Sequence, residues 1–162
     1  MSGAFRTHGT EAANLIAGNG VGGVYGVNPT AKILPILFFG ANDMTRANML
    51  DTISWAAGLP VAGVPPNPNP ARIINMIIAG CLAVCEADLQ QVINHVSEKK
   101  IVVVAAAGEN FHKPLPEPAN CKNVISLGAL DASNKIEVYS VFDSCATLYA
   151  PGGGKRLSGS WN

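Results

Sequence analysis

The chain has 162 residues, which is enough for one domain or a large part of one. Eleven Lys and Arg residues balance eleven Asp and Glu residues, and this balance argues against a basic surface for binding nucleic acid or an anionic membrane. With 48% hydrophobic and 14% charged residues, the sequence is too apolar for a disordered chain and predicts a folded core.

Targeting and redox state are predicted from short local patterns. The longest mostly apolar stretch, residues 73–85, is shorter than the roughly 20 residues of a membrane-spanning helix, so we predict no membrane association. The N-terminal sequence MSGAFR lacks the pattern of a secretory signal, so the chain as written is expected in the cytoplasm with reduced thiols. The spacing of the four cysteines is not that of a zinc site, and we predict neither a metal nor a cofactor.

Hydrophobic periodicity predicts an alternation of helices and strands. Helices are expected over residues 11–18, 45–57 and 87–99. Strands are expected over residues 32–39, 72–79, 101–107, 124–129, 136–140 (an edge strand) and 146–150. Thr45 is the expected N-cap of the second helix, and Gly58 its stop, before a proline-rich loop over residues 58–70.

Continuous apolar strands between amphipathic helices indicate an α/β fold, with a mostly parallel sheet and helices on both faces. We treat residues 1–162 as a single incomplete domain. Residues 18–23 (GNGVGG) match the spacing of a dinucleotide-binding loop, which follows a strand and precedes a helix. Here a predicted helix precedes them, so we interpret them as a glycine-rich turn.

Three segments carry a resemblance to a known family. Residues 8–18 read HGTEAANLIAG, residues 74–80 read INMIIAG and residues 102–109 read VVVAAAGE. In this order they resemble the H-G-T-H-V-A-G-x-I-A-G, I-N-M-S-L-G-G and V-V-V-A-A-A-G-N motifs of the subtilisin-like serine proteases, the subtilase family. Further matches cover nearly the whole chain. The resemblance implies a truncated subtilisin-like fold and the activity of a serine endopeptidase, a hydrolase of polypeptides.

The resemblance also implies a role for each matching residue. His8 corresponds to the general base of a Ser–His–Asp triad. The strand that pairs with the substrate backbone falls on Ile77, Ile78, Ala79 and Gly80. A wall of the pocket for the side chain beside the scissile bond falls on Ala106, Ala107 and Gly108. Glu109 stands where the family has the Asn that stabilises the oxyanion.

The chain departs from the family at the catalytic centre. The family's Asp lies upstream of its His segment, and none of the seven residues before His8 is acidic. The nucleophilic Ser lies in a G-T-S-M-A segment that has no match here. Glu109 would repel an oxyanion, and Asn110 fits its role only after a one-residue shift. Ile77 and Ala79 replace a small Ser and a Gly of the substrate strand. We therefore expect this chain alone to be catalytically inactive.

Three interpretations stay open at this point. The chain is a subtilase segment that needs complementary pieces carrying Asp and Ser, or a pseudoprotease that binds a polypeptide along residues 75–80 by strand addition, or a gene remnant without function. The expected partner is a polypeptide substrate or a protein, and a homo-oligomer could cover the exposed sheet edges. Some secreted relatives have cysteines at the positions of Cys85 and Cys121, which implies a disulfide conditional on export.

Overall fold

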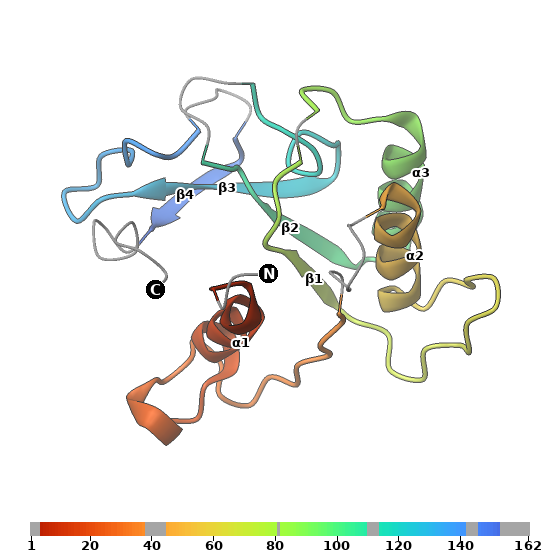
Figure 1. Ribbon diagram of the computed structural model, residues 1–162, viewed down its shortest axis with the longest axis horizontal. Coiled ribbons are helices and arrows are strands. Elements are labelled where there is room, and N and C mark those ends of the chain that lie inside the picture. Colours follow the sequence, from red (N-terminus) through yellow and green to blue (C-terminus); the bar gives the residue numbers. More distant parts are fainter. Residues whose placement is uncertain (1–3, 38–44, 81, 110–113, 142–145, 153–162) are drawn as a thin grey trace. The chain divides into compact units, whose positions relative to one another are not determined.

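The structure is a computed structural model that describes residues 4–37, 45–80, 82–109, 114–141 and 146–152. It divides into two compact units (Figure 1). The first comprises Met1–Leu37 and Gly159–Asn162, and the second comprises Phe38–Ser158.

The first unit begins with a helix and continues into a glycine-rich turn. Helix α1 (Ala4–Ala17) is followed by Gly18, whose amide donates to the carbonyl of Asn14 at 2.8 Å. An antiparallel bridge between Asn19 and Tyr25 encloses the short helix η1 (Val21–Gly23). The φ angle of Gly20 is 89°, a left-handed conformation that favours glycine. This segment is therefore a turn, as its sequence context indicates.

Two predictions for the first unit are wrong. The expected helix over residues 11–18 begins seven residues earlier, at Ala4, so His8 lies inside α1 and not before its start. The expected strand over residues 32–39 is not formed by residues 32–37, and residues 38–39 lie outside the described part. Pro35 interrupts this run, and proline has no amide hydrogen to donate to a sheet.

A parallel sheet forms the centre of the second unit. It contains strands β1 (Ile73–Met76), β2 (Val102–Ala106), β3 (Val124–Leu130) and β4 (Leu148–Pro151), paired in this order. All three pairings are parallel. The prediction of an α/β fold with a parallel sheet is confirmed. Among the described residues, β1 and β4 are the two edges of this sheet.

Some strand predictions need correction. The strand expected over residues 72–79 ends at Met76, and residues 77–80 continue outside the ladder. The strand expected over residues 136–140 is reduced to one antiparallel bridge between Ile136 and Leu130. There the chain turns at once, because the amide of Ser140 donates to the carbonyl of Glu137 at 2.9 Å.

The helices of the second unit follow the sequence signals closely. Helix α2 (Arg46–Ala56) starts at Thr45, whose Oγ1 accepts a hydrogen bond from the amide of Asn48 at 3.2 Å. Gly58, with a φ of 69°, follows its end. Helix α3 (Ala87–Glu98) carries its fully buried side chains at helical spacing, and they are Leu89, Ile93 and Val96.

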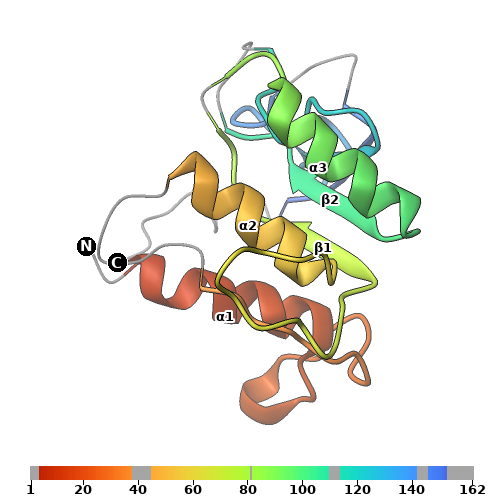
Figure 2. The same cartoon turned by 90° about the vertical axis from the view of Figure 1, so that its right-hand side faces the viewer.

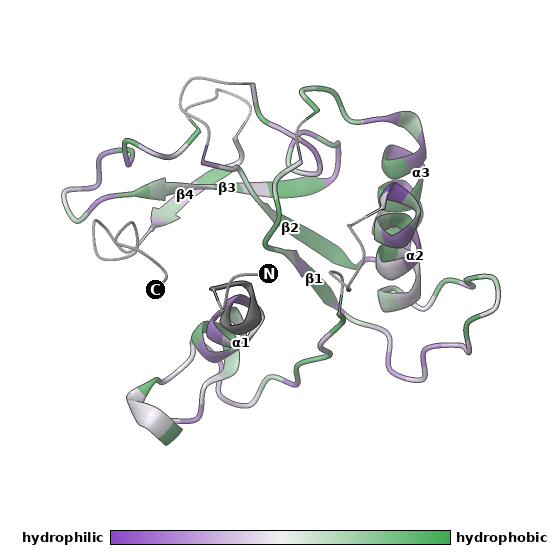
Figure 3. Ribbon diagram, viewed as in Figure 1, coloured by the Kyte–Doolittle hydropathy of each residue, from purple (hydrophilic) through white to green (hydrophobic). Residues whose placement is uncertain are grey.

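Both helices cover the same face of the sheet. Helices α2 and α3 lie side by side in front of β1 and β2 (Figure 2). One core joins Ile53 of α2 and Ile93 of α3 with Val103 and Ala105 of β2. Figure 3 shows β2 as uniformly hydrophobic, whereas α2 and α3 carry residues of both kinds. The hydrophobic side chains of the two helices pack into this core, and their polar side chains are left to contact solvent or the neighbouring helix.

Candidate functional site

The carboxyl ends of β1 and β2 meet at one edge of the sheet, where ligands of open parallel sheets bind. Residues 77–80 follow β1, and Ala107 and Gly108 follow β2. The φ angle of Gly108 is 92°, and a Cβ atom placed on it would lie 3.3 Å from the Cβ of Ala79. The structure thus brings together two predicted groups, residues 77–80 and residues 106–108.

A turn around Glu117 closes the other side of this edge. The amide of Gly80 donates to the carbonyl of Glu117 at 2.7 Å, and the amide of Glu117 donates to the carbonyl of Leu82 at 3.0 Å. A Cβ atom on Gly80 would lie 2.9 Å from the Glu117 carbonyl oxygen, which leaves no room for a side chain. Gly80 therefore allows the two backbones to touch.

A cavity of about 210 Å³ lies where these segments meet the start of α2. Its lining residues are Thr45, Arg46, Met49, Ile78, Ala79, Gly80, Glu117 and Pro118. Most of its wall is apolar, and two charged side chains contribute to it. Such a mixture, with few polar groups in an apolar wall, is typical of ligand sites.

The charged part of the site is organised around Arg46. Its Nη1 donates to Oε1 of Glu117 at 2.8 Å, its Nε donates to Oδ2 of Asp88 at 2.8 Å, and the same Nε lies 3.0 Å from Oε2 of Glu86. These hydrogen bonds, the one to Asp88 first, raise the pKa of Arg46. The same bond lowers the pKa of Asp88 to about 2. The pair is therefore fully ionised at neutral pH.

Glu117 is the buried member of this group. Its side chain is 8% exposed, whereas the side chains of Glu86 and Asp88 are 51% and 48% exposed. Its Oε2 atom is buried and has no hydrogen-bond partner among the described residues. Burial of a carboxylate oxygen without a partner is costly, so this atom requires an explanation.

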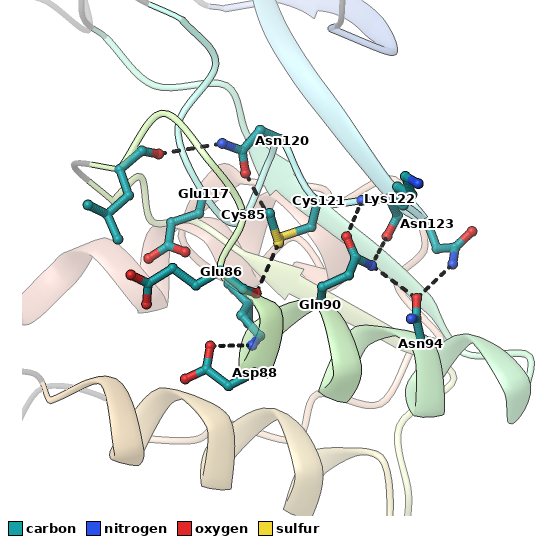
Figure 4. Close-up of a disulfide and its surroundings, with 12 residues drawn as sticks. Cys85, Glu86, Asp88, Gln90, Asn94, Glu117, Asn120, Cys121, Lys122 and Asn123 are labelled. Atoms are coloured by element: carbon teal, nitrogen blue, oxygen red, sulfur yellow. Dashed lines mark hydrogen bonds between the residues drawn. A yellow bond between two sulfur atoms is a disulfide. The ribbon is translucent and has the colours of Figure 1, made fainter.

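A disulfide joins Cys85 to Cys121, 36 positions apart (Figure 4). It ties the segment before α3 to the turn that carries Glu117. Around it, the amide of Lys122 donates to Oε1 of Gln90 at 2.8 Å. The prediction of reduced thiols is wrong for this pair, because sequence spacing does not show that the turn folds back onto the start of α3. Cys81 and Cys145 lie outside the described residues.

Of the other predicted site residues, Glu109 is not among those that line the cavity. Glu109 is exposed directly after Gly108. Burial raises the pKa of Tyr139, and the nearby carboxylates of Glu137 and Glu109 raise it further. His8 belongs to helix α1 of the first unit. Asn110 lies outside the described residues.

Sequence reasoning missed Arg46, Glu86, Asp88 and Glu117. The contact between Arg46 and Glu117 spans 71 positions, and no periodic pattern encodes it. The only local signal is the PLPEP run at residues 114–118, which indicates a rigid turn with one charged residue inside it. Within the described part of the chain, no helix is long and apolar enough to cross a membrane, and no three His, Cys, Asp or Glu side chains are grouped to hold a metal.

Comparisons with known proteins agree with this architecture. The model of the subtilase family matches residues 2–162. An extracellular protease of Xanthomonas campestris pv. campestris is 36% identical over 148 residues, which are 90% of this chain and 25% of that protein. An extracellular basic protease of Dichelobacter nodosus is 34% identical over 149 residues, 90% of this chain and 24% of that protein.

Solved structures show the same similarity. A protease from Pseudoalteromonas arctica superposes with a TM-score of 0.77 at 33% identity, over 86% of this chain and 42% of that one. The chain spans about a quarter of the length of the two bacterial proteases above. It is therefore similar to one part of these proteins.

Proposed function

Because the chain belongs to the subtilase family, we propose that it forms the polypeptide-binding part of a subtilisin-like serine protease and that, by itself, it binds an extended polypeptide without cleaving it. One observation carries this proposal. The cavity lies directly beside residues 78–80, which continue an edge strand of the sheet and match the family's substrate strand.

The binding mode follows from the edge position of β1. An extended polypeptide can lie along residues 75–80 by strand addition, which uses main-chain hydrogen bonds for affinity. The amide of Gly80 takes no part in this pairing, because it already donates to the carbonyl of Glu117. Side chains of a bound strand alternate in direction, so one of them can enter the cavity while its neighbours point away. Ala79 is exposed at the rim of this cavity, and Ile78 is half-buried in its wall.

The expected lack of cleavage rests on the chemistry of the triad. Peptide hydrolysis by this family needs a nucleophile, a base, a carboxylate that orients the base and donors for the oxyanion. The sequence contains no G-T-S-x-A segment, and Glu109 places a negative charge at the oxyanion position that the resemblance implies. The resemblance thus implies a base at His8, while the given sequence contains no match to the family's nucleophile segment.

A second candidate function is cleavage after assembly with complementary polypeptides. The match of residues 8–18 to the family's His segment favours it, because a base is retained there. A mixture of this chain with polypeptides that carry the family's Asp and Ser segments should then hydrolyse an unfolded protein. The activity should disappear in His8→Ala, and equal cleavage with Ala at this position would exclude His8 as the base.

The disulfide favours an oxidising compartment over the cytoplasm. The names of the two bacterial relatives, both extracellular proteases, support this further proposal. Mass spectrometry of the protein, digested without reductant, should recover a linked peptide pair that contains Cys85 and Cys121. Recovery of only unlinked, alkylated peptides from cells that export the protein would contradict it.

Binding is tested with a defined unfolded polypeptide. The probe is fluorescein-labelled α-lactalbumin, reduced and carboxymethylated, and the readout is its fluorescence anisotropy. Titration with the chain should give a saturable rise, and Ala79→Phe should weaken binding about tenfold or more by obstructing the rim. Ala132→Phe is the matched control, because Ala132 is exposed in the turn after β3 and does not line the cavity. No saturable rise with the wild-type chain would overturn the proposal.

A further inference from the structure

We propose that a row of basic side chains at the amino ends of the parallel strands binds a linear anionic polysaccharide, such as a sulfated glycan. This row, called the basic edge below, consists of Arg72, Lys99, Lys100 and Lys122. It lies at the opposite end of the sheet from the proposed polypeptide site. The inference therefore goes beyond the proposed function and does not depend on polypeptide binding.

The order of the strands brings these four residues together. Arg72 comes directly before β1, residues 99–100 lie between α3 and β2, and Lys122 lies two residues before β3. The carbonyl of Arg72 accepts a hydrogen bond from the amide of Val102 at 3.1 Å, and β2 pairs with β3 on its other side. Neighbouring strands are ~5 Å apart, so the basic residues form a short row across three strands.

Hydrogen bonds fix the backbone of the basic edge. Gln90 of α3 holds Lys122 through both ends of its amide group (Figure 4). Its Oε1 accepts from the amide of Lys122 at 2.8 Å, and its Nε2 donates to the carbonyl of Lys122 at 3.1 Å. The amide of Lys100 donates to the carbonyl of Ser97 at 2.8 Å. A ligand therefore has to order only the side chains, which reduces the entropy lost on binding.

Lys100 has a backbone conformation that does not favour lysine. Its φ angle is 60°, in the left-handed region where glycine and asparagine are less costly. Asn123, directly before β3, has a φ of 67° and is such a residue. The turn at position 100 would thus be more stable with glycine or asparagine, and the lysine adds a positive charge in spite of this cost.

The four basic side chains are exposed and are not neutralised by ion pairs. Within the part of the chain that the structure describes, every salt bridge belongs to Arg46. Glu98, at the exposed end of α3, is the acidic residue nearest to them in sequence. Four positive charges and one negative charge give this edge a formal sum of +3. An anionic ligand can bind here without displacing a carboxylate from any of the four.

Charge is separated between the two ends of the sheet. Acidic residues of the second unit gather at the carboxyl ends of the strands and at the start of α3, and they are Glu86, Asp88, Glu109, Glu117, Asp131 and Glu137. A polyanion is therefore attracted to the amino ends of the strands and repelled from the end that holds the polypeptide site. The balanced composition gives no sign of this separation, because it depends on the order of the strands.

The size of the edge and the disulfide favour a polysaccharide over other polyanions. Proteins that bind nucleic acid present larger basic surfaces and a basic domain, whereas this chain has a formal net charge of zero. The disulfide favours an oxidising compartment, away from the nucleic acids and the anionic inner leaflet of the cytoplasm. Lysine side chains are flexible point charges, which suits the separate sulfate or carboxylate groups of a single flexible chain.

Stabilisation of α3 is the competing explanation for two of these residues. Lys99 and Lys100 follow the end of α3, where positive charges interact favourably with the helix dipole. This explanation does not cover Arg72 and Lys122, which precede strands. It also predicts an effect on stability alone, whereas the inference predicts an effect on binding.

The test uses fluorescein-labelled heparin oligosaccharides, with fluorescence anisotropy as the readout. Dissociation constants are measured at a series of salt concentrations for the wild-type chain, for Lys122→Gln and for the double variant Lys99→Gln with Lys100→Gln. Lys135→Gln is the matched control, because Lys135 is an exposed lysine in the turn after β3, at the other end of the sheet.

The wild-type chain should bind saturably, and its Kd should rise as salt is added. Lys122→Gln should weaken binding about threefold and the double variant about tenfold, whereas Lys135→Gln should change the Kd less than about twofold. The slope of log Kd against log salt should fall by about one for each lysine removed from the basic edge. Absence of saturable binding would overturn the inference. Equal weakening in Lys135→Gln would assign binding to total charge and would also overturn it.

Unlabelled competitors identify the class of polyanion. Dextran sulfate should displace the labelled heparin, and uncharged dextran should not. Poly-L-glutamate or duplex DNA that competes better than dextran sulfate, at an equal concentration of charge, would overturn the choice of a polysaccharide.

Folding of the variants is checked by circular dichroism. Should Lys122→Gln not fold, the double variant compared with Lys135→Gln still decides whether the basic edge binds the glycan. Failure of the labelled α-lactalbumin to bind would overturn the proposed function and leave this inference intact.

Discussion

Arg46 and Asp88 join the first turns of α2 and α3 through two hydrogen bonds, from Nε to Oδ2 at 2.8 Å and from Nη2 to Oδ1 at 2.5 Å. The two residues are 42 positions apart. Arg46 reaches Glu117 in the cavity wall from the same position. The pair therefore links the packing of the two helices to the geometry of the proposed binding site.

Asp88→Asn should make stability less dependent on pH in acid. The pKa of Asp88 is lowered to about 2 in the folded chain, while its ordinary value is about 4. The stabilisation is therefore complete above about pH 4 and is lost as the pH falls towards 2. Urea denaturation of both proteins at a series of pH values should show the wild-type advantage shrinking over this interval. A difference that stays constant down to pH 2 would contradict this.

Reduction of the disulfide should destabilise the chain by about 3–4 kcal/mol, because it closes a loop between residues 36 positions apart. Urea denaturation with and without a phosphine reductant measures the difference. The double variant Cys85→Ser with Cys121→Ser is the control, and reductant should leave its midpoint unchanged. An equal shift in the control would place the effect elsewhere than in this bond.

Gly80→Ala should lower the free energy of unfolding by about 1–3 kcal/mol. An added methyl group would lie 2.9 Å from the carbonyl oxygen of Glu117 and would weaken the hydrogen bond between the two backbones. Gly9→Ala is the contrasting variant, because Gly9 lies inside α1 and has no atom within 4 Å of an added Cβ. It should stabilise the helix by about 0.5–1 kcal/mol. Thermal unfolding followed by circular dichroism compares the stabilities of the two variants. A Gly80→Ala protein more stable than Gly9→Ala would contradict the close backbone contact between Gly80 and Glu117.

Tyr139 should ionise at a higher pH than an ordinary tyrosine, because burial and the carboxylates of Glu137 and Glu109 disfavour its anion. The stability that neutral Tyr139 contributes is complete below about pH 10 and is lost as the pH rises through its raised folded-state pKa. The absorbance of tyrosinate is measured against pH in the wild-type chain and in Tyr139→Phe, and the difference between the two curves gives the titration of Tyr139. Glu109→Gln should lower the pKa, and Glu98→Gln, at the exposed end of α3, should not. An effect of equal size in both variants would show that Glu109 is not close to the ring.

The sequence predicted best what short-range chemistry determines. Thr45 caps α2 and Gly58 follows its end, because both signals act within a few residues. The strand expected around Pro35 is wrong, because an apolar run does not form a strand without an aligned partner and a full set of amides. The end of β1 at Met76 was missed for a related reason, since residues 77–80 make their contacts with the distant turn at Glu117.

For the candidate site too, the sequence predicted the residues that belong to local motifs and missed those whose contacts are long-range. Motif resemblance identified residues 77–80 and 106–108, and the structure places these two groups together. It could not identify Arg46 and Glu117, because their pairing depends on how a turn 71 residues away folds back onto α2. A buried charge is recognisable only after its partner and its burial are known.

The most direct test of the account follows binding and cleavage in one sample. The chain is incubated with the labelled, reduced and carboxymethylated α-lactalbumin, anisotropy reports the complex, and mass spectrometry reports the integrity of the polypeptide. An active subtilisin serves as the positive control for cleavage. The account predicts a saturable complex whose polypeptide stays intact. Cleavage products that form with the wild-type chain and are lost in His8→Ala would contradict it.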